Sequence, residues 1–325
     1  MDEGRVPPVD LRQLHYFVAI AEQGSISSAA AVLGLAQPSL SEHISRLERK
    51  LDTQLIIRGA RGVHLTEAGV ALAQHAREIL HGVEVAVEDV RHLGGEARGP
   101  VSIGFPPSMG LLLSVPLAET IQAEFPRVRL HIAEAMSGYI MEWIINERIE
   151  LGCVYEVPDA SQVSVQPILS EDLFLVTAPD NWDGAILPNG RAEKPITLAD
   201  VQSLPLVLPS RPHGAREVIE RFAKSNGVRL DVVTEIDSLP QIIAMADRAS
   251  AYTILPHAAV INEVANGTLA LVEIVKPTIR RTAYLIRKRS RSVTRASQVV
   301  EQELTTIIGE MIDRHHLEAR LPKAE

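Results

Sequence analysis

Residues 11–51, LRQLHYFVAIAEQGSISSAAAVLGLAQPSLSEHISRLERKL, decide the fold of the N-terminal part of the chain. Apolar side chains recur in this stretch at helical spacing, and two glycines interrupt the pattern. Asp10 and Gln13 have the spacing of a capping box, and Ser25 can cap the segment that follows Gly24. The stretch therefore predicts three short helices.

The third of these helices begins near Gln37-Pro38, because proline is tolerated in the first turn. Its apolar residues fall on one face, at Leu40, Ile44, Leu47 and Leu51. The opposite face carries short or polar residues: Gln37, Pro38, Ser41, Glu42, Ser45 and Arg49. Two helices joined by a short turn, with the second polar on its outer face, are typical of a helix-turn-helix. A plain three-helix core with a solvated face fits the pattern as well.

A β-hairpin is predicted next. Leu55-Ile56-Ile57-Arg58 and Val63-His64-Leu65 are short apolar runs, and the Gly-rich tip 59–62 lies between them. This hairpin would be the wing of a winged helix-turn-helix over residues 1–65. Arg58 and Arg61 suit contacts with phosphate or the minor groove.

One long helix is predicted over residues 66–93. Its apolar residues repeat at intervals of three or four, at Leu72, Ala76, Ile79, Val83, Val87, Val90 and Leu93. A single apolar stripe on a helix of this length indicates pairing with a second copy as a dimerisation helix. Packing of the helix on its own domain is the alternative. Residues 94–100, GGEARGP, predict a hinge.

From residue 101 onward, strands and helices alternate, which predicts an α/β domain over 101–325 with mainly parallel sheets. Strands are expected at Val101–Phe105, Arg129–Glu134, Leu151–Tyr155, Leu173–Thr177, Leu204–Leu208, Arg229–Glu235, Tyr252–Leu255, Leu269–Val275 and Arg281–Ile286. The length suits two subdomains, the first over about 101–168 and 276–312 and the second over about 169–275.

Composition narrows the class of protein. The chain has 325 residues and a net charge of −9, which argues against a nonspecific DNA-coating protein. Residues 1–65 carry seven basic and seven acidic side chains, so the negative charge belongs to the remainder. The single cysteine, Cys153, lies in an apolar run and is expected to be buried. The chain shows neither a signal peptide nor an 18-residue apolar run, so we expect a protein of the cytoplasm.

The N-terminal residues resemble the LysR-type transcriptional regulators. The resemblance rests on LRQLHYF at 11–17, Gly24-Ser25, Ala29-Ala30, AQPSLS at 36–41, Ile44, Leu47-Glu48, Leu51, Arg58, Arg61, Leu65-Thr66 and Ala68-Gly69. Weaker matches continue to Thr253-Ile254-Leu255-Pro256, so the resemblance covers nearly the whole chain. Residues 101–106, 174–176 and 208–210 are similar to the nitrogen-assimilation-control branch of that family.

The resemblance implies a regulator that binds double-stranded DNA at an interrupted inverted repeat. The third helix would enter the major groove, and the residues implied to face DNA are Gln37, Pro38, Ser39, Ser41, Glu42 and Arg46, with Arg58, Arg61 and His64 in the wing. Gln can pair with adenine, whereas Glu42 belongs against a cytosine amino group or outside the contact. Dimers through residues 66–93 would pair into a tetramer, with RNA polymerase as a further partner. The resemblance also implies a bacterial protein that is associated with the nucleoid.

The resemblance also implies a C-terminal domain like a periplasmic solute-binding protein, with a small-molecule effector between two subdomains. The implied lining is Pro107, Ser108, Met109, Ser137, Ser210, His213 and Arg216. Serines, an arginine and helix N-termini suit a small anionic metabolite. Helix capping is the other interpretation of the serines. No cofactor or metal is expected.

Some residues depart from the family pattern. Ala249 and Ala251 stand where glycine is common, and alanine is strained if the backbone there has positive φ. Glu147–Glu150 replaces a Gly-Glu-Leu-Asp turn, and Ala36 replaces a frequent Ser or Thr cap.

An enzyme is not expected. The chain has no Gly-x-Ser-x-Gly elbow, no zinc-spaced His/Cys cluster and no Gly-rich phosphate loop. A transport-type solute-binding protein would leave the first 65 residues unexplained. A DNA-bending protein would leave the α/β domain unexplained.

Overall fold

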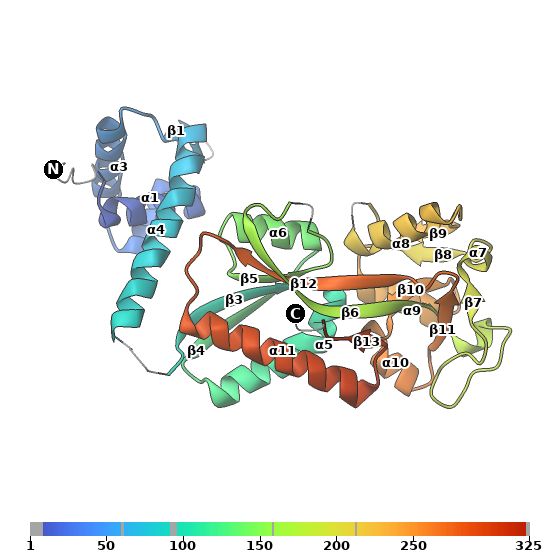
Figure 1. The fold of residues 1–325 in the computed structure, drawn as a ribbon. Coiled ribbons are helices and arrows are strands. Elements are labelled where there is room, and N and C mark those ends of the chain that lie inside the picture. Colours follow the sequence, from blue (N-terminus) through green and yellow to red (C-terminus); the bar gives the residue numbers. More distant parts are fainter. Residues whose placement is uncertain (1–8, 60–61, 92–95, 158, 212, 323–325) are drawn as a thin grey trace. The chain divides into compact units, whose positions relative to one another are not determined.

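The computed structural model describes residues 9–59, 62–91, 96–157, 159–211 and 213–322. The chain divides into two compact units, residues 1–95 with 290–294 and residues 96–289 with 295–325 (Figure 1). We call the first the head and the second the effector domain, after the function that the resemblance implies for it, and describe each by itself.

The three predicted helices of the head are confirmed as α1 (Leu11–Gln23), α2 (Ile26–Leu33) and α3 (Gln37–Leu51). Asp10 and Gln13 form the capping box, with the Gln13 backbone N–H donating to the Asp10 carboxylate at 2.8 Å. Gly24 ends α1 in the left-handed region at φ 59°, which glycine adopts without strain. Ser25 then caps α2, as its spacing predicted.

The head core forms where the apolar faces of these helices meet. Leu40, Ile44 and Leu47 of α3 are fully buried with Phe17 and Ile20 of α1. The predicted hairpin is confirmed as β1 (Ile56–Gly59) and β2 (Gly62–Leu65), paired antiparallel. Most side chains of the hairpin are exposed or half-buried, so its own core is small.

The long helix is α4 (Glu67–Arg91). Its first part packs on α1, where Ala73 and Ala76 are buried. Further along, Ile79, Val83 and Val87 are exposed within this chain. The predicted positions Val90 and Leu93 lie outside the side chains that the structure describes.

The effector domain is built on one large curled sheet with the strand order β4-β3-β5-β12-β6-β11-β7, and β10 and β13 also pair with β6. These strands are β3 (Gly99–Phe105), β4 (Val128–Glu134), β5 (Leu151–Val154), β6 (Val163–Thr177), β7 (Ile196–Thr197), β10 (Thr253–Pro256), β11 (Ala270–Val275), β12 (Arg280–Lys288) and β13 (Ala319–Arg320). A smaller parallel pair is β8 (Leu206–Leu208) and β9 (Val232–Glu235).

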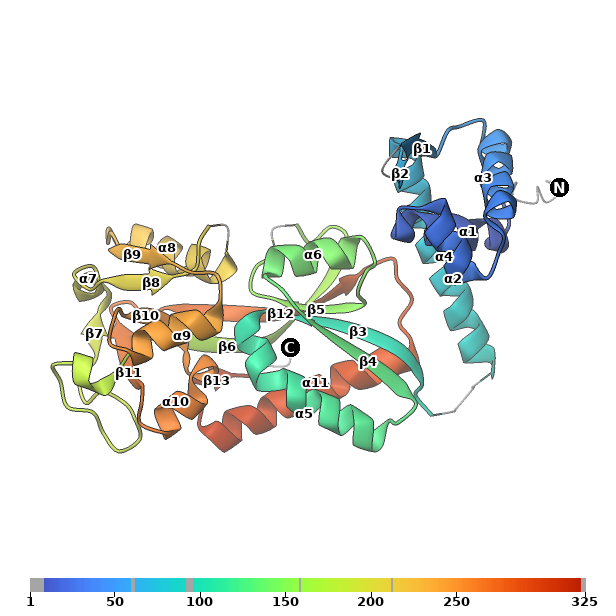
Figure 2. The same cartoon turned by 180° about the vertical axis from the view of Figure 1, so that it is seen from behind.

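The expectation of mainly parallel sheets is wrong. β3 pairs parallel with β4 and β5, but β12 is antiparallel to β5 and β6, and β6 is antiparallel to β10, β11 and β13. The physical reason is that β6 carries the chain out of one half of the domain and β12 carries it back. Two such strands lying side by side must run in opposite directions, as Figures 1 and 2 show.

The helices of this domain cover the two halves of the sheet. They are α5 (Pro107–Glu124), α6 (Ser137–Ile145), α7 (Leu198–Val201), α8 (Gly214–Ser225), α9 (Leu239–Asp247), α10 (Ile261–Ala265) and α11 (Arg295–His315), with 3₁₀ turns at Pro179–Asn181 and His257–Ala259. We call lobe I the half with β3, β4, β5, α5, α6 and α11, and lobe II the half with α7 to α10.

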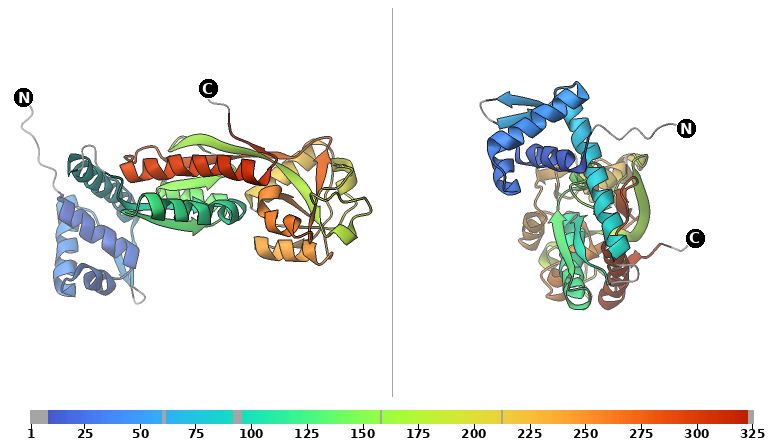
Figure 3. Two further views of the ribbon diagram at one scale, coloured as in Figure 1. Left: turned by 90° about the horizontal axis from the view of Figure 1, so that it is seen from below. Right: turned by 90° about the vertical axis from the view of Figure 1, so that its left-hand side faces the viewer.

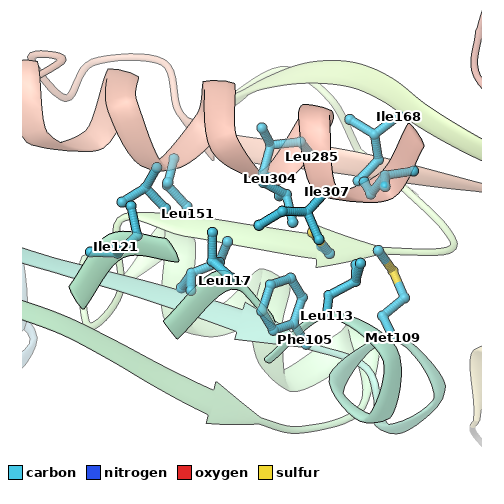
Figure 4. Packing of buried hydrophobic residues seen from close by; sticks show 14 of the residues in the cluster. Phe105, Met109, Leu113, Leu117, Ile121, Leu151, Ile168, Leu285, Leu304 and Ile307 are labelled. Carbon is cyan, nitrogen blue, oxygen red and sulfur yellow. The ribbon is translucent and has the colours of Figure 1, made fainter. Parts of the chain in front are cut away.

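Each lobe has its own core. In lobe I, Phe105 of β3 and Leu113 and Leu117 of α5 pack against Leu304 and Ile307 of α11 (Figure 4). Figure 3 shows α5 and α11 lying along each other. Lobe II has two clusters on either side of its part of the sheet. The two long strands therefore link two separately packed bodies, and no helix in the described part of the chain is long and apolar enough to cross a membrane.

Two turns that depart from the family pattern have strained backbones. Ala249 lies in the left-handed region at φ 55°, where a side chain costs about 1–2 kcal/mol. Glu147 lies there at φ 56°, and its carboxylate accepts a hydrogen bond from the buried Lys288 Nζ at 2.6 Å. Ala251 is instead a buried core residue.

Candidate nucleic-acid interface and effector pocket

The outer face of α3 is exposed and polar. Gln37, Pro38, Ser39, Glu42 and Arg46 are exposed and Ser41 is half-buried. Ala36 precedes the helix and makes no side-chain cap, so the first-turn N–H groups of α3 are not covered by a capping side chain. The N-terminus of a helix attracts anions, and the phosphate of a nucleic acid is such an anion.

Glu42 is part of an ion pair. Its Oε1 lies 3.3 Å from Arg49 Nη2, and both side chains are more than half exposed. The pair offsets the charge of Glu42 on a face that would meet phosphate. Arg49 thus belongs to the outer face of α3, as its helical spacing predicts. The set of residues predicted to contact DNA does not include it.

The wing places two predicted residues at the surface. Arg58 and His64 are exposed, on β1 and β2 respectively. In the hairpin register Arg58 is opposite Val63 and His64 is opposite Ile57, so the two side chains occupy neighbouring rungs of the ladder. Arg61 lies outside the described residues.

The effector domain contains a cavity of about 590 Å³, its open mouth included, lined by both lobes. Its lining is Pro106, Pro107, Ser108, Met136, Ser137, Tyr155, Pro209, His213, Gly214, Ala215, Asp237, Leu239, Ile242, Ile254, Leu255, Pro256 and Arg281. The first turns of α5, α6, α8 and α9 all contribute to it. Four helix N-termini turned toward one space give it a positive potential. Most of the remaining wall is apolar.

A buried polar network forms the lobe I end of this cavity. Arg281 on β12 donates through Nε to Glu171 Oε1 at 2.8 Å, and through Nη2 to Ser108 Oγ and Tyr155 Oη, each at 2.9 Å. Tyr155 Oη also donates to Glu171 Oε1 at 3.2 Å. All four side chains are buried. Ser137 joins the network indirectly, because its Oγ accepts from the Tyr155 backbone N–H at 3.2 Å.

The network keeps Arg281 charged inside the protein. Burial by itself would lower the pKa of the guanidinium, but Tyr155 and Glu171 raise it above its usual value. The guanidinium also lies 3.6 Å from the centre of the Tyr155 ring, in cation–π geometry. Burial raises the pKa of the Tyr155 hydroxyl, so this group remains a neutral donor.

Lobe II contributes His213 and Asp237 to the wall of the cavity. Burial, followed by the nearby Arg281, lowers the pKa of His213, so its imidazole is neutral at pH 7. His213 Nδ1 caps α8 by accepting from the Ala215 backbone N–H at 3.2 Å. Asp237 at the wall accepts from the backbone N–H and hydroxyl of Ser210, which lower the pKa of its carboxyl.

The structure brings Pro107, Ser108, Ser137 and His213 of the predicted set to the cavity. Three others lie elsewhere. The Met109 side chain is in the lobe I core, because in α5 it faces the sheet. Ser210 is not among the lining residues, although its backbone N–H and hydroxyl donate to Asp237, which is.

Arg216 is the third residue that does not line the cavity. Its guanidinium pairs with Glu220 and Glu235 at 2.6 and 3.0 Å and donates to the Pro209 carbonyl at 2.8 Å. It thus fixes the loop after β8 instead of facing a ligand. The cavity's buried arginine is Arg281, which the sequence prediction missed. It also missed the lining residues Tyr155 and Asp237, and Glu171, which does not line the cavity but accepts a hydrogen bond from Arg281. The signal in the sequence that could have indicated Arg281 is its position at the start of the strand predicted over Arg281–Ile286.

Cys153 is fully buried in lobe I, and burial raises the pKa of its thiol. A thiol with this environment is a poor nucleophile. The prediction of a structural cysteine is confirmed.

Both units of the chain match known protein families. The model of the LysR substrate binding domain matches residues 94–306, and that of the bacterial regulatory helix-turn-helix protein, lysR family, matches residues 11–70. The nitrogen assimilation regulatory protein Nac of Escherichia coli (strain K12) is 31% identical over 304 residues, 93% of this chain and 96% of Nac. This agrees with the branch named from the sequence.

Two solved structures share the fold. A cysteine variant of full-length OxyR from Pseudomonas aeruginosa superposes with a TM-score of 0.74 at 19% identity, covering 92% of this chain and 94% of that one. Full-length CbnR in complex with its target DNA gives a TM-score of 0.60 at 22% identity, covering 93% and 100%. The relatives are transcriptional regulators and not enzymes. The chain belongs to the LysR family of DNA-binding transcriptional regulators and carries the effector-binding domain of that family.

Proposed function

We propose that the head reads an interrupted inverted repeat in DNA. The α3 residues Gln37, Pro38, Ser39, Ser41, Glu42 and Arg46 lie at the major groove, and the wing residues Arg58, Arg61 and His64 contact the neighbouring backbone or minor groove. The exposed polar face of α3 in a chain of this family is the observation that carries this part. Gln37 is suited to adenine, and the Arg58 guanidinium to phosphate.

The exposed stripe on α4 is covered by the α4 of a second copy. Ile79, Val83 and Val87 follow one another at intervals of four, which is one face of a helix. Apolar residues exposed along a helix of 25 residues are stabilised by pairing. Two such dimers associate through their effector domains into a tetramer, which acts on the nucleoid in the bacterial cytoplasm and contacts RNA polymerase there.

The cavity between the lobes holds a small metabolite with one anionic group and an apolar body. The anionic group is placed at the α5 and α6 N-termini beside Arg281, Ser108 and Ser137, and the body against the apolar wall. The observation that carries this assignment is the buried Arg281 at one end of a cavity whose remaining wall is mostly apolar. A ligand that touches both lobes shifts their relation only through different affinity for the two arrangements.

The test of DNA reading begins with the full-length protein and a random duplex pool. Rounds of selection should yield a repeat with a spacer, and footprints should show two or more phased protected segments. Recovery of no common sequence would overturn sequence-specific binding. Val83→Glu on the exposed stripe should break the tetramer into dimers held by their effector domains in sedimentation experiments, because a buried charge opposes the pairing of α4. The phased pattern of protection should then be lost.

The test of the cavity uses Ala215→Trp, which fills the space from the first turn of α8 and leaves the buried network intact. A panel of small carboxylates, screened by thermal shift, should contain members that stabilise the wild type but not this variant. Equal stabilisation of both proteins would place the effector elsewhere. Footprints of Ala215→Trp that match those of the wild type would show that DNA binding does not depend on the cavity.

A further inference from the structure

The wing is a two-stranded hairpin with little core of its own. Of its base residues, Leu55 and Ile56 are buried, but the other β1 side chains are exposed and none of β2 is fully buried. An isolated two-stranded hairpin is marginally stable in water. Contacts with the rest of the head must therefore decide how the wing is oriented relative to α3.

Glu48 makes such a contact from the recognition helix itself. Its Oε1 accepts hydrogen bonds from the backbone N–H groups of Leu55 at 2.8 Å and Ile56 at 3.2 Å. These are the two residues with which the hairpin begins. Hydrogen bonds to a charged acceptor are stronger than neutral ones, so one carboxylate ties the base of the wing to α3.

Other contacts hold the wing near its tip and its far strand. The Val63 N–H on β2 donates to the Gly24 carbonyl at 2.8 Å, in the turn between α1 and α2. A side chain at Gly62 would approach that same carbonyl to 2.5 Å, so the contact also requires glycine at this position. Thr66 N–H donates to the Leu55 carbonyl at 3.0 Å. Of these contacts, the one from Glu48 comes from α3.

We infer that Glu48 is a positioning residue for DNA binding, which sets the angle of the wing, and so of Arg58 and His64, relative to α3. The side chain need not touch DNA. The inference rests on the proposed function, in which one bound duplex meets both the outer face of α3, from Gln37 to Arg46, and Arg58 of the wing. A wing that pivots about its base would lose its phosphate contacts while α3 kept its own.

The test compares Glu48→Ala and Glu48→Gln in the full-length protein, bound to a duplex that the wild type selects from a random pool. Glu48→Ala should bind about tenfold more weakly, the effect of losing one charge-assisted interaction. The slope of log affinity against log salt should fall by about one, the share of one phosphate contact. Protection by the wing should disappear from the footprint and protection in the major groove should remain.

Glu48→Gln keeps one acceptor oxygen and should recover part of the affinity. Glu22→Gln is the matched control, since it removes the same charge from α1, where Glu22 lies 3.6 Å from Arg77 with its side chain more than half exposed. This control should leave affinity and footprint unchanged.

A double-mutant cycle with Arg58→Ala separates positioning from general stability. If Glu48 acts through the wing, Glu48→Ala weakens binding less once Arg58 is gone, because the contact of Arg58 is already lost, and the two effects are not additive. Additive effects would overturn the inference. It would also be overturned if Glu48→Ala lost both protections together with a lower melting temperature, because the carboxylate would then only stabilise the head.

Discussion

The surface of the head that we propose faces DNA and the cavity of the effector domain are assembled in opposite ways. The head offers exposed side chains from one short stretch, Gln37 to His64, on a helix and the hairpin that follows it. The cavity draws mostly buried side chains from Pro106 to Arg281, on at least seven separate segments. A binding surface for a large partner can be formed by residues close together in the sequence. A pocket for a small molecule requires the fold to bring distant segments together.

The same contrast holds for their ion pairs. Glu42 and Arg49 are 58% and 70% exposed, and such a pair contributes about 0–1 kcal/mol. Glu171 and Arg281 are 5% and 3% exposed, so each charge depends on the other. Breaking the buried pair tests this difference most severely.

Arg281→Met should destabilise the effector domain by about 3–5 kcal/mol, since Glu171 is left charged and buried without its partner. Urea unfolding of the full-length protein, followed by a probe in this domain, measures the loss. The double variant Arg281→Met with Glu171→Leu should recover most of it. If Arg281→Met were as stable as the wild type, an unpaired Glu171 would cost no more at the end of the cavity than an unpaired charge costs on the surface of the head.

His257 predicts a pH effect confined to the effector domain. Burial, then the charge of Arg191, lowers the pKa of His257 to about 4 from 6.5. The unfolded chain therefore binds a proton between these values that the folded one does not, and stability falls as pH is lowered from about 6.5 toward 4. Partial exposure reduces the effect to about 1–2 kcal/mol.

Thermal unfolding between pH 4 and 7 measures the effect, with His257→Asn as the comparison. The variant should show a shallower pH dependence over this window. Identical slopes for the two proteins would assign the acid sensitivity to other groups.

Arg58→Ala tests the exposed surface. Affinity for the selected duplex should fall about tenfold across sequences, with a salt slope smaller by about one, because one phosphate contact is lost and no base contact changes. Binding isotherms at four salt concentrations supply both numbers. Unchanged affinity and slope would remove Arg58 from the interface.

Ala249→Gly is expected to have the smallest effect. Glycine relieves the left-handed strain but loses more backbone entropy on folding, which leaves a net gain of about 0.5 kcal/mol. Ala251→Gly is the control, since this buried neighbour should be destabilised by the same exchange. Equal losses at both positions would show that the turn at Ala249 carries no strain.

Local chemistry predicted the head well. The Asp10–Gln13 box, the stop at Gly24 and the apolar face of α3 depend on residues within one or two turns, and all were found as expected. β6 shows where this kind of prediction fails. The expected strand covered only Leu173–Thr177, whereas β6 begins at Val163 and passes Pro167 at a bulge opposite Ala283 and Tyr284. A proline within a run is usually a sign against a central strand.

The sequence by itself determined the helix-turn-helix, the wing, the α/β alternation and the family, because caps, turns and apolar periods act between near neighbours. It also placed Ser108 and Ser137 at helix starts that line the cavity. Only the tertiary structure decided that β6 and β12 run antiparallel through both lobes, and that Arg281, Glu171 and Tyr155 meet there. Their side chains are separated by up to 126 positions along the chain, and only the pairing of the two long strands brings them within hydrogen-bonding distance.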